Sequence, residues 1–234
     1  MIRLIIAAAT ALAVHTAQAE PYVRIDGGYS WATDAGIRDK DFSSDGFICG
    51  DTGCTEGGEI NRVGESGVYS AGLGWRFNPS FRVDLSGAYR GGYGLKDTDQ
   101  LPSEFRADIK STSVMLAGYY DMRLGFTRPY VGAGVGWAKN KIGTISNSGG
   151  ALAPISTERP GGTWTGMAWS VMLGVGIPLW SRLTLDIGYR YVDLGKIESQ
   201  PGDVTCAPTP CPGVTYSGLS GRLRAHEVMG GFRF

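Results

Sequence analysis

The chain has little of what nucleic-acid binding or histidine-based chemistry requires. Its 22 lysines and arginines are balanced by 22 aspartates and glutamates, so the formal net charge is zero. Such a balance provides no basic excess, and no nucleic-acid partner is expected. Only two histidines occur, His15 and His226. A catalytic or metal site would therefore have few imidazoles to draw on.

Long apolar runs are also missing. The run from Leu4 to Val14 is well short of the roughly 20 residues that a membrane-spanning helix needs. It follows Arg3 and precedes Ala17-Gln18-Ala19, a small-x-small pattern typical of a secretory cleavage site. We therefore expect residues 1–19 to be a cleaved signal peptide and residues 20–234 to form one domain.

Glycine and aromatic residues are plentiful, with 37 glycines in the chain and 11% aromatic residues. The chain contains eight segments of about ten residues in which apolar side chains alternate with polar or small ones. Each segment could cross a bilayer as a tilted strand with a lipid-facing and an inward face. The segments are 22–31, 68–77, 81–90, 109–121, 129–139, 165–177, 182–191 and 226–234. This pattern predicts an all-β fold, an eight-stranded antiparallel transmembrane up-and-down β-barrel.

The connections alternate in length, as in bacterial barrels with short periplasmic turns and long extracellular loops. Short connections cover 78–80, 122–128 and 178–181, and the first has the turn chemistry of Asn78-Pro79-Ser80. Long connections, rich in Gly, Pro and Ser, cover about 32–67, 91–108, 140–164 and 192–221. We expect these four stretches to be irregular extracellular loops.

Several of these features together resemble a known family. The signal peptide, the eight segments, the phrase from Arg128 to Trp137 and the final Gly231-Phe-Arg-Phe234 are similar to small Gram-negative outer-membrane β-barrels of the opacity and OmpA types, within the porin-family outer-membrane proteins. The resemblance implies the outer membrane as location, with its lipid as surroundings. It also implies that the outer-membrane assembly machinery recognises Phe234. It does not specify an activity, since members are envelope components, adhesins, small channels or enzymes.

The four cysteines form two C-x4-C pairs, Cys49 with Cys54 and Cys206 with Cys211, in the first and fourth long loops. Secretion favours disulfides. Local pairing would restrict each loop, while pairing across loops and a shared zinc site are the alternatives. Structural zinc sites normally use tighter spacings.

The inward positions of the predicted strands carry opposite charges. An eight-stranded barrel is just wide enough for side chains to fill it, which favours a salt-bridged plug. The alternative is a narrow conduction path whose arginine excess would favour anions. The predicted lumen residues are Arg24, Asp26, Arg76, Arg82, Asp84, Arg90, Asp121, Arg182, Asp186, Arg190, Glu227 and Arg233.

No catalytic, cofactor or metal site is expected. Alternation places His226 outward and Glu227 inward, which is a poor arrangement for a catalytic pair. The glycines of Gly132-Ala-Gly134-Val-Gly136 lie within a strand and make room for neighbouring side chains, so they do not indicate a nucleotide site. We expect a non-enzymatic surface component whose loops recognise an extracellular ligand or surface partner. A narrow pore is the second reading and a lipid-modifying enzyme the third.

Overall fold

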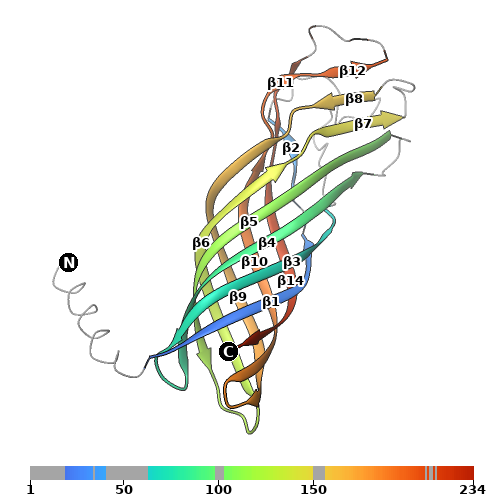
Figure 1. The fold of residues 1–234 in the computed structure, drawn as a ribbon. Coiled ribbons are helices and arrows are strands. Elements are labelled where there is room, and N and C mark those ends of the chain that lie inside the picture. The colour runs from blue at the N-terminus through green and yellow to red at the C-terminus, as the bar shows by residue number, and fades with distance from the viewer. Residues whose placement is uncertain are drawn as a thin grey trace, which may run out of the picture.

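The computed structural model contains a closed antiparallel barrel of eight strands, which confirms the predicted fold class (Figure 1). The structure describes residues 19–33, 35–40, 63–97, 103–149, 156–208, 210, 213 and 215–234. The barrel strands are β1 (Glu20–Ala32), β3 (Glu65–Arg76), β4 (Phe81–Asp97), β5 (Ser103–Asp121), β6 (Arg128–Ile142), β9 (Gly162–Trp180), β10 (Leu183–Glu198) and β14 (Leu219–Arg233). Neighbours in this order pair with one another, and β1 pairs with β14 to close the ring.

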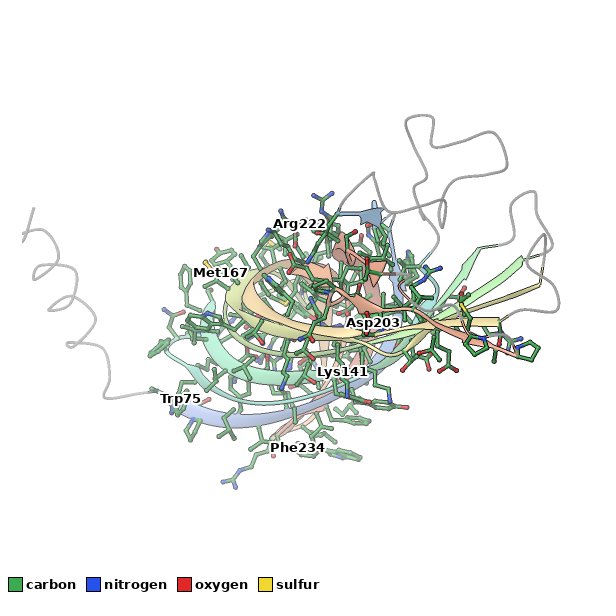
Figure 2. The ribbon with its side chains drawn as sticks, turned by 90° about the horizontal axis from the view of Figure 1, so that it is seen from above. Trp75, Lys141, Met167, Asp203, Arg222 and Phe234 are labelled. Carbon is green, nitrogen blue, oxygen red and sulfur yellow. The ribbon has the colours of Figure 1, made fainter. Side chains whose placement is uncertain are left out.

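The alternation of each strand separates an outer apolar face from an inner face. On β3, Tyr69, Leu73 and Trp75 point outward and are exposed, whereas the glycines and serines between them are buried. Trp75 and Met167 lie on the outside of the ring of strands (Figure 2). So much exposed apolar surface around a barrel requires lipid rather than water as its neighbour. No helix in the described part of the chain is long and apolar enough to cross a membrane.

The two ends of the barrel differ. At one end, here called the turn end, short turns at 77–80, 122–127 and 181–182 join the strands, and β14 finishes there (Figure 1). The first turn is fixed by Asn78, whose Oδ1 accepts hydrogen bonds from the backbone N–H groups of Ser80 at 2.8 Å and Phe81 at 2.9 Å. The opposite end, with the long connections, is the loop end.

At the loop end the long connections are less irregular than the sequence led us to expect. β4 and β5 pair as far as Asp97 and Phe105. The short strands β7 (Ile145–Gly149), β8 (Ser156–Arg159) and β12 (Thr205–Ala207) then extend the sheet beyond the barrel, in the order β12-β8-β7-β5 (Figure 1). We call β7, β8, β12 and the paired parts of β4 (93–97) and β5 (103–109) the loop-end sheet. It joins residues of three long connections.

Three further short strands lie at the same end. β2 (Arg38–Asp39) pairs with β14, and β11 (Gly202–Asp203) pairs with β13 (Thr215–Tyr216). The backbone N–H of Arg222 donates to the carbonyl of Ala35 at 2.8 Å, which holds the segment after β1 against β14. The side chain of Ile37 in this segment is completely buried.

Candidate functional site

Paired charges fill the interior of the barrel near the turn end. Arg24 on β1 forms a two-pronged contact with Asp26, with Nε to Oδ2 at 2.9 Å and Nη2 to Oδ1 at 2.8 Å. Its Nη1 also donates to Asp84 Oδ2 at 3.0 Å and to the Tyr119 hydroxyl at 2.9 Å. All four side chains are buried. Burying charges is costly unless each is paired in this way.

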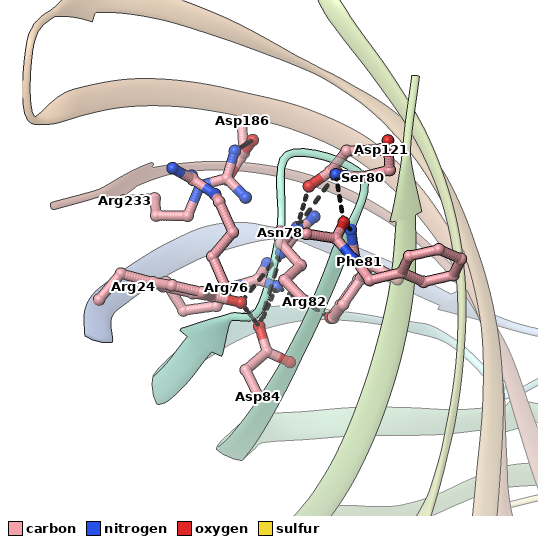
Figure 3. A network of polar contacts seen from close by, with 12 residues as sticks. Arg24, Arg76, Asn78, Ser80, Phe81, Arg82, Asp84, Asp121, Asp186 and Arg233 are labelled. Carbon is pink, nitrogen blue, oxygen red and sulfur yellow. Dashed lines mark hydrogen bonds and ion pairs between the residues drawn. The ribbon is translucent and has the colours of Figure 1, made fainter. Parts of the chain in front are cut away.

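Arg82 extends the same group of contacts, and Figure 3 shows it beside the turn at Asn78. Its Nε binds Asp121 Oδ2 at 3.0 Å, and its guanidinium lies 3.8 Å from the centre of the Tyr119 ring. On the other side of the lumen Arg233 Nη2 binds Asp186 Oδ1 at 3.2 Å. We call these residues the turn-end network, comprising Arg24, Asp26, Arg82, Asp84, Tyr119, Asp121, Asp186 and Arg233.

Inward glycines leave room for the tyrosines of this network. A Cβ atom at Gly132 would lie 2.5 Å from the ring of Tyr119, which is too close for any real side chain. This geometry supports the interpretation that Gly132 is small to accommodate a neighbour. The inward tyrosines, Tyr119 included, were not among the predicted lumen residues, although alternation from Asp121 back along β5 points to position 119.

A second cluster lies closer to the middle of the barrel. Glu227 on β14 is completely buried and binds two arginines, Arg90 Nε at 2.6 Å and Arg190 Nε. Ser30 donates to Glu227 Oε1 at 3.1 Å, and Arg90 Nη1 donates to Ser113 Oγ at 3.0 Å. We call Glu227, Arg90, Arg190 and Ser30 the Glu227 node. The carboxylate of Glu227 on β14 therefore binds side chains of three other strands, β1, β4 and β10.

Of the twelve predicted lumen residues, ten are buried inside the barrel. They comprise five arginines and five carboxylates, so the expected arginine excess is absent there. Arg76 is only half-buried, at the turn end, and its Nη1 lies 3.5 Å from Glu20 Oε2. Arg182 does not face the lumen as predicted, because β10 begins only at Leu183 and Arg182 lies exposed in the preceding turn.

The loop-end half of the interior is packed with apolar side chains that the sequence did not single out. Completely or almost completely buried residues come from several barrel strands, and we call them the apolar plug: Tyr93, Ala107, Ile109, Ala138, Ile142, Val192, Leu194, Ile197, Leu219, Leu223 and Ala225. The sequence contains a signal for some of these residues. Every second residue of β14 before the inward Glu227, namely Ala225 and Leu223, also faces inward. Between the turn-end network and the Glu227 node lies a cavity of about 20 Å³, which has room for roughly one water molecule.

His226 lies on the outer face, as alternation predicted. Its ring stacks with Trp31 at a centroid distance of 6.0 Å, and its Nδ1 makes a short contact with the Tyr189 hydroxyl. Tyr191 packs on the same ring at 5.2 Å. These neighbours are aromatic, and Glu227 points the other way into the lumen. The arrangement matches an aromatic girdle rather than a catalytic pair.

The structure describes only one of the four cysteines. Cys206 on β12 is disulfide-bonded, whereas Cys49, Cys54 and Cys211 lie outside the described residues, so the proposed pairing stays a prediction. Within the described ranges no group of three or more histidine, cysteine, aspartate or glutamate side chains could hold a metal ion. Phe234 is exposed at the turn end, with its backbone N–H donating to the carbonyl of Val23 at 2.9 Å.

With this geometry in view, comparison with known proteins is informative. Residues 4–207 match the model of the outer membrane protein beta-barrel domain. The chain belongs to this family. It is thus a barrel of the Gram-negative outer membrane, and the short turns of such barrels face the periplasm. The turn end of this outer-membrane barrel is therefore periplasmic and its loop end extracellular.

Sequence relatives and solved structures are similar to this chain to different extents. Uncharacterized proteins of Brucella abortus and Brucella suis are each 31% identical over an alignment of 144 positions, which covers 53% of this chain and 50% of the relative. The chain thus spans about half the length of these curated relatives. The outer membrane protein OprG of Pseudomonas aeruginosa has a TM-score of 0.51 at 15% identity, covering 91% of this chain and 95% of OprG. Neisserial surface protein A has a TM-score of 0.47 at 18% identity, covering 92% and 97%.

Proposed function

We propose that this protein is a non-enzymatic surface component that presents its loop-end sheet to an extracellular partner. The barrel anchors that sheet in the outer membrane and does not conduct. One observation carries the proposal, namely the extension of the barrel wall into an ordered sheet on the extracellular side.

The loop-end sheet is held by backbone pairing between distant parts of the chain. Ser103 to Arg106 on β5 pair with Gly149 to Ser146 on β7, and Thr157 on β8 pairs with Cys206 on β12. A surface fixed in this way loses less conformational entropy on binding than a free loop does. It also places polar side chains such as Glu158, which is exposed, on a rigid support. Binding surfaces on rigid scaffolds are a common use of such connections.

A narrow pore is less well supported. The turn-end network and the Glu227 node pair five arginines with five carboxylates inside the lumen, and the apolar plug fills the loop-end half. An ion would have to break several buried pairs and then cross a region filled mainly by apolar side chains. Bilayer recordings on the refolded barrel should show no reproducible conductance steps, and regular steps would favour the pore.

A lipid-modifying enzyme is the third reading, and it would have to use His226 at the outer surface. The aromatic neighbours of His226 provide no carboxylate to orient the ring. Replacing His226 with Gln should leave the lipid A composition of an expressing strain unchanged. A change in lipid A that requires His226 would make the protein an enzyme.

The structure allows the loop-end sheet to be shortened without opening the barrel. Ile142 on β6 and Gly162 on β9 are direct partners in the register. Residues 143–161 can therefore be replaced by Asn-Gly, which closes a two-residue hairpin and removes β7 and β8. The variant should keep the heat-dependent gel mobility of a folded barrel.

Adherence tests the proposal directly. Cells of a laboratory Gram-negative strain that display the full chain are compared on wells coated with laminin, fibronectin or collagen. We expect retention on at least one coating, loss of that retention in the shortened variant, and full retention in the turn-end control Arg123→Gln. Equal retention of the shortened variant, or no retention of the parent chain on any coating, would refute the proposal.

A further inference from the structure

The arginine excess expected for the lumen occurs at its periplasmic mouth. There a hollow of about 1110 Å³ is enclosed by the first residues of β1, the ends of β3 and β14, the start of β6 and the turn before β10. Its charged lining consists of Glu20 and four arginines, which we call the arginine mouth: Arg76, Arg128, Arg182 and Arg233. We propose that the arginine mouth is a binding site for a phosphate group.

The strongest indication comes from Arg233. This side chain is only 2% exposed, and one of its nitrogens, Nη2, binds Asp186. Its Nε and Nη1 are buried and have no hydrogen-bond partner within the described chain. Buried donors of a charged group are rarely left without an acceptor. Because Arg233 lines the hollow, a rotation of its guanidinium toward the hollow would bring these donors to an anion bound there.

The remaining charges of the mouth are available to the same anion. Arg128 and Arg182 form no ion pair with any residue that the structure describes. Arg76 contacts Glu20 at 3.5 Å, but the Glu20 side chain is 76% exposed and its contact is weak. A neighbouring hollow shares Arg76 and Arg128 and adds Arg123. An incoming anion therefore meets an excess of positive charge, and its acidic competitors are Asp186 at Arg233 and the loosely held Glu20 at Arg76.

The number of guanidinium groups favours phosphate over a carboxylate. A single planar guanidinium already satisfies both oxygens of a carboxylate. Several guanidinium groups around one hollow suit a tetrahedral group with three or four acceptor oxygens. The phosphate could belong to a soluble periplasmic molecule or to a phospholipid head group of the inner leaflet. The exposed side chains of Trp180 and Phe234 line the same hollow and would sit beside lipid chains.

The test uses the refolded chain in dodecylmaltoside micelles, which contain no phosphate, with inorganic phosphate as the probe in isothermal titration calorimetry. The informative variant is Arg128→Gln with Arg182→Gln, because both residues lie at the mouth and neither belongs to the buried network. Its matched control is Lys139→Gln with Lys141→Gln, which removes two charges from the exposed outer face of β6. Both variants are checked for heat-dependent gel mobility, so a folding defect is recognised.

We expect saturable binding with one site in the parent chain and in the lysine control, weakened about tenfold or more in the arginine variant. Absence of saturable binding to the parent chain would overturn the proposal. Equal weakening in both variants would also overturn it, because the binding would then reflect overall charge.

A second arm distinguishes the source of the phosphate. Adding phosphatidylglycerol to the micelles should weaken the binding of inorganic phosphate if a lipid head group occupies the mouth. Unchanged affinity would support a soluble phosphate compound as the ligand. Both results retain the site and differ only in which molecule supplies the phosphate.

Discussion

Towards the periplasmic turn end the barrel interior is filled mainly by paired charges, whereas towards the extracellular loop end it is filled mainly by apolar side chains. Both groups of side chains occupy the lumen, but their contributions to stability have different physical origins. The charged half is stable only while every partner is present, because an unpaired buried charge is far more costly than an unmade contact. The apolar half loses stability gradually, in proportion to the volume removed. The contrast predicts that equally conservative substitutions have unequal effects in the two halves.

The largest effect is expected at the Glu227 node. Changing Glu227 to Gln leaves Arg90 and Arg190 buried without a counter-charge, and the free energy of unfolding should fall by about 3–5 kcal/mol. Urea unfolding in lipid bilayers, followed by tryptophan fluorescence, measures this loss. Glu198→Gln is the control, since its contact with Lys40 spans 3.6 Å between partly exposed side chains.

The same node offers a sharper test. Replacing Arg90 and Arg190 with Met and Glu227 with Leu removes all three charges together, and this variant should lose less stability than Glu227→Gln alone. A greater loss in the triple variant would mean that the ion pairs themselves, rather than the avoidance of unpaired charge, stabilise the barrel.

A somewhat smaller effect is expected in the apolar plug. Leu223 is completely buried, and Leu223→Ala should lower the free energy of unfolding by about 3 kcal/mol through lost contacts and a residual cavity. The same urea titration applies. Leu223→Met, which conserves volume, should cost less than about 1.5 kcal/mol. Similar losses in both variants would argue against tight packing at this position.

The next prediction concerns close packing within the charged half. Gly132→Ala places a Cβ against Tyr119, whose ring lies over the guanidinium of Arg82, and should cost about 1–3 kcal/mol. Gly118 on the neighbouring strand faces outward and has no atom within 4 Å of the corresponding position. Gly118→Ala is therefore a matched control that should be close to neutral. The temperature at which each variant loses its folded gel mobility is the measurement. Gly132→Ala should lose it at a lower temperature than Gly118→Ala.

Alternation along the strands was sufficient to predict the barrel and most of its lumen. In a barrel with lipid outside and packed side chains inside, successive residues of a strand alternate between the outer and the inner face. This alternation placed Arg24, Asp84 and Glu227 inside the barrel, where they are buried. Arg182 was misplaced because alternation does not locate the end of a strand. The pairing of β9 with β10 ends at Trp180 and Leu183, which leaves Arg182 in the turn between them.

The loop-end sheet was missed for a different reason. Segments such as Ile145–Gly149 and Ser156–Arg159 consist largely of polar residues. Strands outside the membrane do not contact lipid, so they do not need an apolar face. Their pairing is also non-local, as β8 meets β12 about fifty residues later in the chain. Neither property leaves a periodic signal in the sequence. Most residues of the apolar plug lie beyond the predicted strand ends, where the alternation of the barrel strands continues.

The smallest effect is expected where charges meet water at the turn end. Glu20→Gln removes the partner of Arg76, yet the pair is 3.5 Å apart and Glu20 is largely exposed, so the free energy of unfolding should change by less than about 0.5 kcal/mol. The comparison with Glu227→Gln is direct, because each substitution removes one carboxylate from an arginine and only the burial differs. A loss from Glu20→Gln as large as that from Glu227→Gln would show that burial does not set the cost. If the arginine mouth binds phosphate, the same variant should bind it more tightly than the parent chain, because the acidic competitor for Arg76 is gone.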